Sequence, residues 1–266
     1  MKKVIPIIFL FLFFAGNLFV LANAKPKKRI KAMAYNVHHC NPPTAGELID
    51  VGAIARVIND HKPDFVALQE IDVNTIRSGK GRNQAQELAQ LTGMFYFFSK
   101  AIDHQGGDYG VAVLSRYPII DSMRIALPIL PDQPEELRAV AAITVALSKK
   151  RNFVFASTHL GLREPNRLIQ VDKIIANLTT LDTPTVIAGD FNAYPESPVI
   201  AKMDQYFTRS CTVNCQYTIP VINPKSTIDY IFYKSAKPIK VRSHQVIDEQ
   251  YASDHLPVFA EFEITL

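Results

Sequence analysis

The clearest chemical feature of the sequence is an acid and an amide two residues apart at the end of an apolar run. The stretch TVIAGDFN, residues 185–192, has the composition of a buried strand and ends in Asp190 and Asn192. Side chains alternate between the two faces of an extended chain, so residues i and i+2 point in the same direction. These two side chains can therefore converge on one small object, although Asp and Asn are also common turn formers where strands end.

Ionisable and amide side chains lie at the ends of other apolar runs as well. Loops at the ends of rigid strands are common places for functional sites. If these ends share one rim, they gather groups that suit Mg²⁺, which prefers oxygen ligands and is often held by one or two carboxylates and a substrate phosphate. The residues are Asn36 in AMAYN, Glu70 in FVALQE, His159 in FVFASTH, Asp229 in TIDYIF, and Asp254 and His255 in SDH.

Most of these residues have a structural explanation when each is taken alone. They could form turns, lie at solvated strand ends or, for His159, be half-buried imidazoles. Asp229 is harder to explain in this way, because it lies inside a strand, where a carboxylate is costly unless it is paired. The coincidence of all of them favours a functional site.

The pattern of apolar residues predicts a mixed α/β chain in which strands outnumber helices. Consecutive strands are not always separated by helices, which argues against a purely parallel, doubly wound sheet. The order favours two largely antiparallel or mixed sheets packed face to face, with helices outside. We expect nine to eleven strands, near 29–36, 65–70, 95–98, 110–115, 138–147, 152–158, 185–188, 228–233, 240–246 and 256–264. Helices are expected near 44–60 with Thr44 as N-cap, 83–91 ended by Gly93, 166–178 and 198–206.

Residues 1–24 have the pattern of a secretory signal peptide. Lys2 and Lys3 precede the apolar run 4–20, and Ala22-Asn23-Ala24 is a cleavage signal. An uncleaved membrane anchor is the alternative, but the apolar run is marginal for a span. We therefore expect export to the periplasm or the cell exterior, one domain over residues 25–266, and no stable membrane span after cleavage. The oligomeric state is not predicted.

Charge and cysteine content narrow the class further. The net charge is +4, and without the two signal-peptide lysines 27 basic residues face 25 acidic ones, which does not by itself indicate a nucleic-acid binder. Cys211 and Cys215 could form a disulfide in an oxidising compartment or remain thiols. A metal pair is disfavoured because no Cys or His lies nearby at zinc-like spacing. Cys40 is expected to be unpaired.

Seven short motifs occur in order along the chain: YNVHH, ALQEID, GDYGVAVLSRYPI, STHL, AGDFNAYP, TIDYIF and SDHLPV. In this order and at these separations they resemble the endonuclease/exonuclease/phosphatase superfamily of metal-dependent phosphoesterases, which includes pancreatic-type deoxyribonuclease, abasic-site endonucleases, neutral sphingomyelinases and inositol phosphatases. GDFN and SDH are weak singly, but the ordered set spans about residues 31–264 and is specific. The resemblance implies a four-layer α/β sandwich of two mixed sheets with outer helices.

The resemblance also implies a metal site and a group that acts on the phosphate. Glu70 would be the main ligand of Mg²⁺, with Asn36 and Asp254 close to the metal or its waters. Mn²⁺ is the alternative ion. In phosphoryl transfer the protein mainly positions groups and neutralises charge.

Five further residues receive roles in the reaction from the same resemblance. Asp190 would orient or deprotonate the attacking water, and Asn192 would hold a phosphate oxygen. His255 would act as acid, base or charge stabiliser, with Asp229 orienting its ring. His159 would contact the phosphate or the leaving group.

The candidate substrate-binding residues are His38, Arg77 and Tyr109. His38 stands where abasic-site endonucleases often have an acid that helps the metal, so it could touch substrate, favour a softer ion such as Mn²⁺, or only form a turn. Arg77 belongs, with Lys80 and Arg82, to a basic loop that could bind a headgroup or a few backbone phosphates, or could simply be solvated.

The substrate class is left open by these motifs, and three functions remain. The near-neutral charge favours a small or lipid-headgroup phosphodiester over nucleic acid. A nuclease, with a basic track beside the site, is the first alternative. A non-catalytic phosphate-binding module is the second, and loss of the site residues would be its signature. Residues 94–98, MFYFF, could form an apolar surface patch, but a buried strand is the favoured interpretation.

Overall fold

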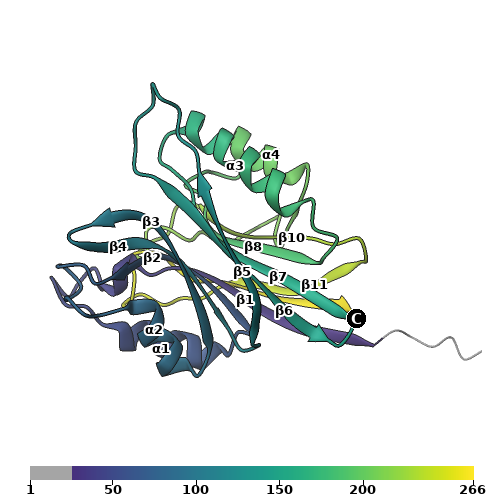
Figure 1. The fold of residues 1–266 in the computed structure, drawn as a ribbon, viewed down its shortest axis with the longest axis horizontal. Helices are drawn as coiled ribbons and strands as arrows, with labels where there is room; N and C mark the ends of the chain where they lie inside the picture. The colour runs from purple at the N-terminus through teal and green to yellow at the C-terminus, as the bar shows by residue number, and fades with distance from the viewer. Residues whose placement is uncertain (1–25) are drawn as a thin grey trace, which may run out of the picture.

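The protein is built from two six-stranded sheets packed face to face, as the computed structural model shows for residues 26–266 (Figure 1). The predicted signal peptide lies outside these described residues. The strand orders are β11-β12-β1-β2-β4-β3 and β5-β6-β7-β8-β10-β9, and both sheets contain parallel and antiparallel pairs. This architecture confirms the predicted sandwich of two mixed sheets with outer helices.

The strands and helices alternate irregularly along the chain. The first sheet contains β1 (Lys27–Asn36), β2 (Phe65–Val73), β3 (Phe95–His104), β4 (Gly107–Ser115), β11 (Ile239–Val246) and β12 (Val258–Thr265). The second contains β5 (Ile119–Leu127), β6 (Arg138–Ser148), β7 (Arg151–His159), β8 (Thr185–Asp190), β9 (Thr208–Arg209) and β10 (Asp229–Lys234). The helices are α1 (Val51–His61), α2 (Gln84–Thr92), α3 (Glu164–Leu178) and α4 (Pro198–Asp204), and a short turn, η1, covers His38–Cys40.

Three apolar layers hold these elements together. The central layer lies between the sheets, where the ring of Phe65 packs 5.1 Å from those of Phe153 and Phe155. Helices α1 and α2 cover the outer face of the first sheet, and α3 and α4 cover that of the second, on opposite sides of the sandwich (Figure 1). Because both sheets are buried on both faces over most of their width, the ends of their strands are held rigidly.

Strand pairing brings the polar strand ends to one rim. In the first sheet β1 and β2 are parallel, and Asn36 pairs with Gln69, the residue before Glu70. In the second sheet His159 pairs with Asp190 across the parallel strands β7 and β8, and Asp190 pairs with Asp229 of the antiparallel strand β10. We call the connecting segments at this end the rim loops: residues 37–50, 74–83, 105–106, 128–137, 160–163, 191–197, 210–228 and 247–257.

The predicted helix start at Thr44 is wrong. The helix begins at Val51, and the Asp50 side chain is its N-cap, accepting a hydrogen bond from the Ala53 N–H at 2.8 Å. The segment before it is a loop held by the Asn41 amide, which donates to the carbonyl oxygens of Gly46 and Leu48. A loop that satisfies its own backbone in this way competes with the first turns of a helix.

Two strands, and the solvent exposure of one segment, differ from the prediction. β5 and the two-residue β9 were not predicted, because β5 is mostly exposed at a sheet edge and shows little apolar alternation. Residues 94–98 were predicted to form a buried strand rather than a patch, yet Phe95 is 49% exposed. The reason is that β3 is the edge strand of its sheet, which sequence alone did not show.

The disulfide and the second helix agree with the sequence-based expectations. Cys211 and Cys215 form a disulfide, with their Cα atoms 5.9 Å apart, whereas Cys40 is free and buried. No helix in residues 26–266 is long and apolar enough to cross a bilayer. The helix predicted over 83–91 runs from Gln84 to Thr92 and ends at Gly93, as expected.

Gly189 provides a test of how closely β8 packs against β7. Its φ of +147° disfavours other residues, and a Cβ there would lie 2.0 Å from the Thr158 carbonyl oxygen on β7. Gly189→Ala is expected to lower the free energy of unfolding by about 3 kcal/mol or more. The matched control, Gly93→Ala, meets no atom within 4 Å and should cost only about 1 kcal/mol. Urea denaturation of both variants measures the difference, and equal losses would contradict the close packing of β7 against β8.

Candidate active site

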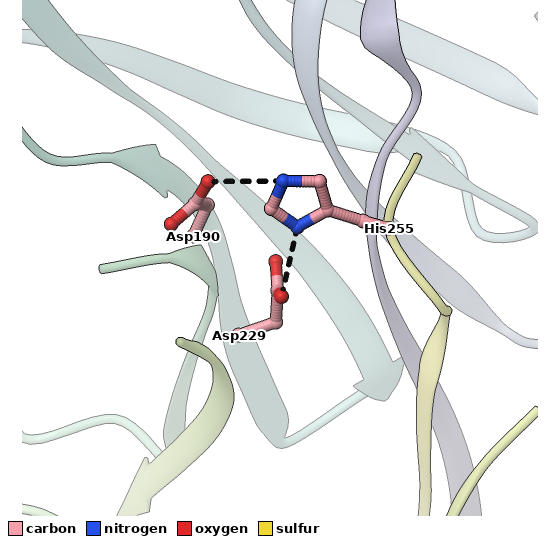
Figure 2. Close-up of side chains that lie close together, drawn as sticks. All are labelled: Asp190, Asp229 and His255. Atoms are coloured by element: carbon pink, nitrogen blue, oxygen red, sulfur yellow. Dashed lines mark hydrogen bonds and ion pairs between the residues drawn. The ribbon is translucent and has the colours of Figure 1, made fainter. Parts of the chain in front are cut away.

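An imidazole held between two buried carboxylates forms the centre of the rim (Figure 2). His255 Nδ1 donates to Asp229 Oδ2 at 3.0 Å, and its Nε2 lies 3.9 Å from Asp190 Oδ2. All three residues are at most 5% exposed. The pairing of β8 with β10 sets the two carboxylates side by side, and the loop before β12 brings the ring to them.

Burial and the neighbouring charges together raise the pKa of both His255 and Asp190. Burial lowers the pKa of His255, but the negative charge of Asp229 and its hydrogen bond outweigh burial and raise the pKa to about 10. Burial and the neighbouring Asp229 charge raise the pKa of Asp190 to about 7. The site therefore holds an imidazolium that can donate a proton beside a carboxylate that can accept one near neutral pH.

His159 approaches the same carboxylate from β7 and is held by an arginine. Arg138 Nη1 donates to His159 Nδ1 at 3.2 Å, so the proton of the neutral ring lies on Nε2, 3.5 Å from Asp190 Oδ2. Burial, followed by the positive charge of Arg138, lowers the pKa of His159 well below its ordinary value. His159 is therefore a neutral hydrogen-bond donor beside Asp190.

Arg138 is a site residue that sequence reasoning missed. It begins β6, lies 7% exposed next to His159, and forms an ion pair with Glu136 at 2.8 Å. The sequence signal was available, because an arginine at the start of a strongly apolar strand is rarely buried unless it is paired. Only the antiparallel pairing of β6 with β7, however, identifies His159 as its neighbour.

Glu70 lies on the first sheet, facing the group just described. The backbone is irregular here, with φ of 61° at Glu70 and a register shift between Leu68 and Ile71. Burial raises the pKa of Glu70, but the His39 ring 3.9 Å from Oε2 and a hydrogen bond from Asn36 bring it well below its ordinary value. The carboxylate is therefore ionised, while 21% of its side chain stays open to solvent.

Asn36 connects the two sheets across the site. Its Nδ2 donates to Glu70 Oε1 and to Asp190 Oδ2, both at 3.1 Å, and its Oδ1 accepts from the His38 N–H. In this arrangement the amide orients two carboxylates, and its oxygen is already used. Its predicted contact with a metal stays a prediction.

Two neighbouring histidines share the turn after β1 and contact different partners. His38 Nδ1 contacts the Asn41 carbonyl oxygen at 2.9 Å and so holds the loop, whereas His39 Nδ1 lies 3.9 Å from Glu70 Oε2. The positive φ of each allows the tight turn, in which the two rings lie edge to face with their centroids 4.5 Å apart. Sequence reasoning considered His38 and missed His39, since YNVHH alone does not say which ring turns inward.

Two further predicted residues, Asn192 and Asp254, lie at the edge of this centre. Asn192 donates through its backbone to Asp190 Oδ1 at 2.8 Å and through Nδ2 to the Leu160 carbonyl oxygen at 2.9 Å. Asp254 is partly exposed, beside Ser253, whose hydroxyl donates to the Asn36 carbonyl oxygen at 2.7 Å. Both residues therefore border the site.

Arg77 is held by a buried carboxylate. Its Nε and Nη2 donate to the two oxygens of Asp72, at 2.7 and 2.9 Å, and Thr75 and Ser78 bond the same carboxylate. The guanidinium lies 5.4 Å from the ring of Tyr109, which is mostly buried. Arg77, one of the three residues predicted to bind substrate, thus has two of its nitrogens engaged within the protein.

A divalent cation fits the side of the site that Glu70 forms. Glu70 Oε2 is charged, partly open to solvent, and has His39 Nδ1 at 3.9 Å as its neighbour. Hard cations prefer such oxygens. The three ligand atoms of Asp190, Asp229 and His255 also lie within 4.8 Å of one another. That group is buried and its imidazole Nδ1 already bonds Asp229, so the donor set at Glu70 is the better match.

Comparison with known proteins places this geometry in a family. A sequence model described as "Endonuclease/Exonuclease/phosphatase family" matches residues 33–255, and the chain belongs to this family of phosphoesterases. The uncharacterized protein YbhP of Escherichia coli K12 is 26% identical over 214 residues, which cover 76% of this chain and 83% of that protein.

Two solved structures share the fold. The mannosyl-6-phosphatase of Bacteroides thetaiotaomicron is 18% identical with a TM-score of 0.69, covering 88% of this chain and 99% of the other. ANGEL2, described as a 2′,3′-cyclic phosphatase, is 15% identical with a TM-score of 0.74, covering 90% and 96%. At these identities the two structures show a common fold alone.

The pKa of His255 tests the arrangement of the central group. Asp229→Asn removes the strongest charge that raises this pKa and leaves burial, which lowers it, opposed only by the weaker charges of Asp190 and Asp254, so the value is expected to fall well below about 10. NMR titration of the His255 ring carbons measures the shift. Asp254→Asn, which removes a weaker and more distant charge, serves as the control and should move the value less. An unchanged pKa in Asp229→Asn would contradict the pairing.

Proposed function

We propose that this protein is an exported, divalent-metal-dependent phosphoester hydrolase that acts on a small or lipid-headgroup phosphodiester. The observation that carries the proposal is the buried Asp190–His255–Asp229 group together with an ionised Glu70 of the other sheet, which Asn36 joins to Asp190. Such a site combines a proton acceptor, a proton donor and an anionic ligand around one space. These are the parts that hydrolysis of a phosphoester requires.

The roles of the central residues follow from their hydrogen bonds. Asp190, with its pKa near neutral, accepts a proton from the attacking water, and Asn36 and the Asn192 backbone hold its two oxygens in place. His255, protonated and oriented by Asp229, donates to a phosphate oxygen or to the leaving group. His159 offers its Nε2–H to the phosphate beside Asp190.

Glu70 is the residue that would hold the cation, with Asp254 and Asn36 close by. Mg²⁺ or Mn²⁺ bound there would neutralise phosphate charge and polarise the attacking water. His39, next to Glu70, gives the ion an imidazole neighbour, which suits Mn²⁺ better than Mg²⁺.

Two other functions have less support. A nuclease would be expected to show a basic track, yet Arg77 is engaged by Asp72 and Arg82 by Glu87. A non-catalytic module would be expected to lack parts of the site, and Glu70, Asp190, Asn192 and His255 are all present. Mannosyl-6-phosphatase and 2′,3′-cyclic phosphatase, the names of two structural relatives, differ in ester type, so they do not decide between mono- and diesters.

Export rests on the sequence of residues 1–24. A purified protein that begins at Lys25 when recovered from the periplasm or the medium would support cleavage after Ala24.

Glu70→Gln tests the metal-dependent reaction. The change removes the charged ligand but keeps the shape, so turnover of bis(p-nitrophenyl) phosphate with Mg²⁺ or Mn²⁺ is expected to fall by roughly 10²-fold or more. The same substitution at an exposed rim position, Glu47→Gln, should leave turnover unchanged. Full activity of Glu70→Gln would overturn the assignment, and p-nitrophenyl phosphate, sphingomyelin and plasmid DNA run alongside separate the substrate classes.

The pH dependence of the same reaction tests the proton-transfer roles. A general base works when it is ionised, so activity should rise as pH increases toward the pKa of Asp190 at about 7. A general acid works when it is protonated, so activity should fall as pH passes the pKa of His255 at about 10. A bell-shaped profile of kcat/KM with its maximum between these values is expected. Activity that falls steadily from pH 6 to pH 8 would contradict these roles.

A further inference from the structure

Large apolar side chains protrude from the loops that surround the site. Among residues 26–266, nine large apolar side chains are more than half exposed, and seven of them lie on rim loops. We call these seven the apolar ring: Leu48, Ile76, Leu162, Tyr194, Val213, Tyr217 and Ile222. The other two, Leu91 and Ile120, lie at the opposite end of the sandwich.

The distribution of the ring distinguishes it from ordinary surface exposure. Single exposed apolar residues are common and need no explanation. Here, however, they come from five separate loops at the one end of the sandwich that holds the site, and Val213 and Leu162 are 75% and 70% exposed. Exposed apolar groups gathered around a site indicate a surface that docks on something apolar.

The depth of the reacting groups limits how a substrate can enter. His159, Asp190 and His255 are each at most 5% exposed, so the phosphate must belong to a slender part of the substrate that can reach them. The phosphodiester headgroup of a phospholipid has this shape, and the acyl chains of the same molecule can remain in the lipid layer while the headgroup enters the site. A protein bound flat on the ring would instead cover the mouth.

The charge of the rim loops restricts the kind of surface on which the ring can dock. Carboxylates outnumber lysines and arginines in these loops, with Glu47, Asp132, Glu196 and Asp248 among them. Two of the rim arginines are already paired, Arg77 with Asp72 and Arg82 with Glu87. A polyanion or a strongly anionic bilayer is therefore disfavoured, whereas the ammonium groups of a zwitterionic lipid are complementary to the acidic loops.

We propose that the apolar ring docks the enzyme on a zwitterionic phospholipid surface, from which a headgroup phosphodiester reaches the buried site. Exposed aliphatic groups enter the outer part of the lipid layer, and the hydroxyls of Tyr194 and Tyr217 remain at the polar interface. The lipid as substrate rests on the proposed function, but the docking itself does not require turnover.

Vesicle binding by matched variants tests this docking. The exported protein is incubated with phosphatidylcholine vesicles, and the bound fraction is measured by flotation at increasing lipid concentration. The ring variant carries Leu162→Ser, Val213→Ser and Ile222→Ser, and the control carries Leu91→Ser, Phe95→Ser and Ile120→Ser at the opposite end. All proteins share one N-terminus, so any contribution from residues 1–25 cancels.

Loss of three apolar groups that enter the lipid on docking should weaken vesicle binding roughly tenfold or more in the ring variant, with the control close to wild type. Hydrolysis of soluble bis(p-nitrophenyl) phosphate should change less than about twofold, because none of the three residues contacts the reacting groups. The proposal is overturned if wild type does not bind these vesicles, if the control loses as much binding, or if the ring variant loses none.

Two further measurements distinguish docking on a zwitterionic lipid from binding of a different kind. Stronger binding to anionic phosphatidylglycerol vesicles that salt abolishes would overturn the zwitterionic assignment. A wild-type dimer that becomes monomeric in the ring variant, without loss of vesicle binding, would make the ring a contact between copies of the chain and overturn the docking. Ring-dependent binding by a protein that hydrolyses no phosphoester would instead contradict the proposed function and leave the docking intact.

Discussion

The constraint on which the site depends is the burial of two carboxylates in directly paired positions of neighbouring strands. Asp190 and Asp229 face each other across β8 and β10, and both are almost fully buried. Two like charges this close in a dry environment are costly unless a cation neutralises them. The imidazolium of His255, bonded to Asp229 and facing Asp190, is that cation within the protein.

The same constraint gives the two halves of the site different chemistry. On the second sheet, burial keeps Asp190 basic enough to accept a proton, and the charge of Asp229 keeps His255 protonated so that it can donate one. On the first sheet, Glu70 is partly open, accepts from Asn36 and stays ionised. Asn36 donates to a carboxylate on each side and so fixes the distance between the proton-transfer half and the cation-binding half.

The conformations of the rim loops around this rigid centre are not set by strand pairing, because the loops carry no strand of either sheet. Some are fastened to the core, such as the loop after β2, in which buried Asp72 collects hydrogen bonds from Thr75, Arg77 and Ser78. Others present apolar tips to solvent. The reaction class therefore belongs to the strand ends, whereas the choice of substrate belongs to the loops.

The sequence alone determined the layers of the fold and most of the residues at the centre of the site. Apolar runs interrupted by polar strand ends show where strands stop, and a carboxylate inside a strand, as at Asp229, requires a partner. Period and composition are local properties, so a single chain reveals them. The ordered motifs then indicated the family, which the comparison of residues 33–255 confirms.

Only the tertiary structure decided which neighbours these residues have. It placed Arg138 against His159, turned His39 rather than His38 toward Glu70, and engaged Arg77 with Asp72. It also put Phe95 on an edge strand, where the sequence had suggested burial. Such contacts join residues far apart in the chain or depend on the rotation of one turn, and no local pattern of residue types records either of them.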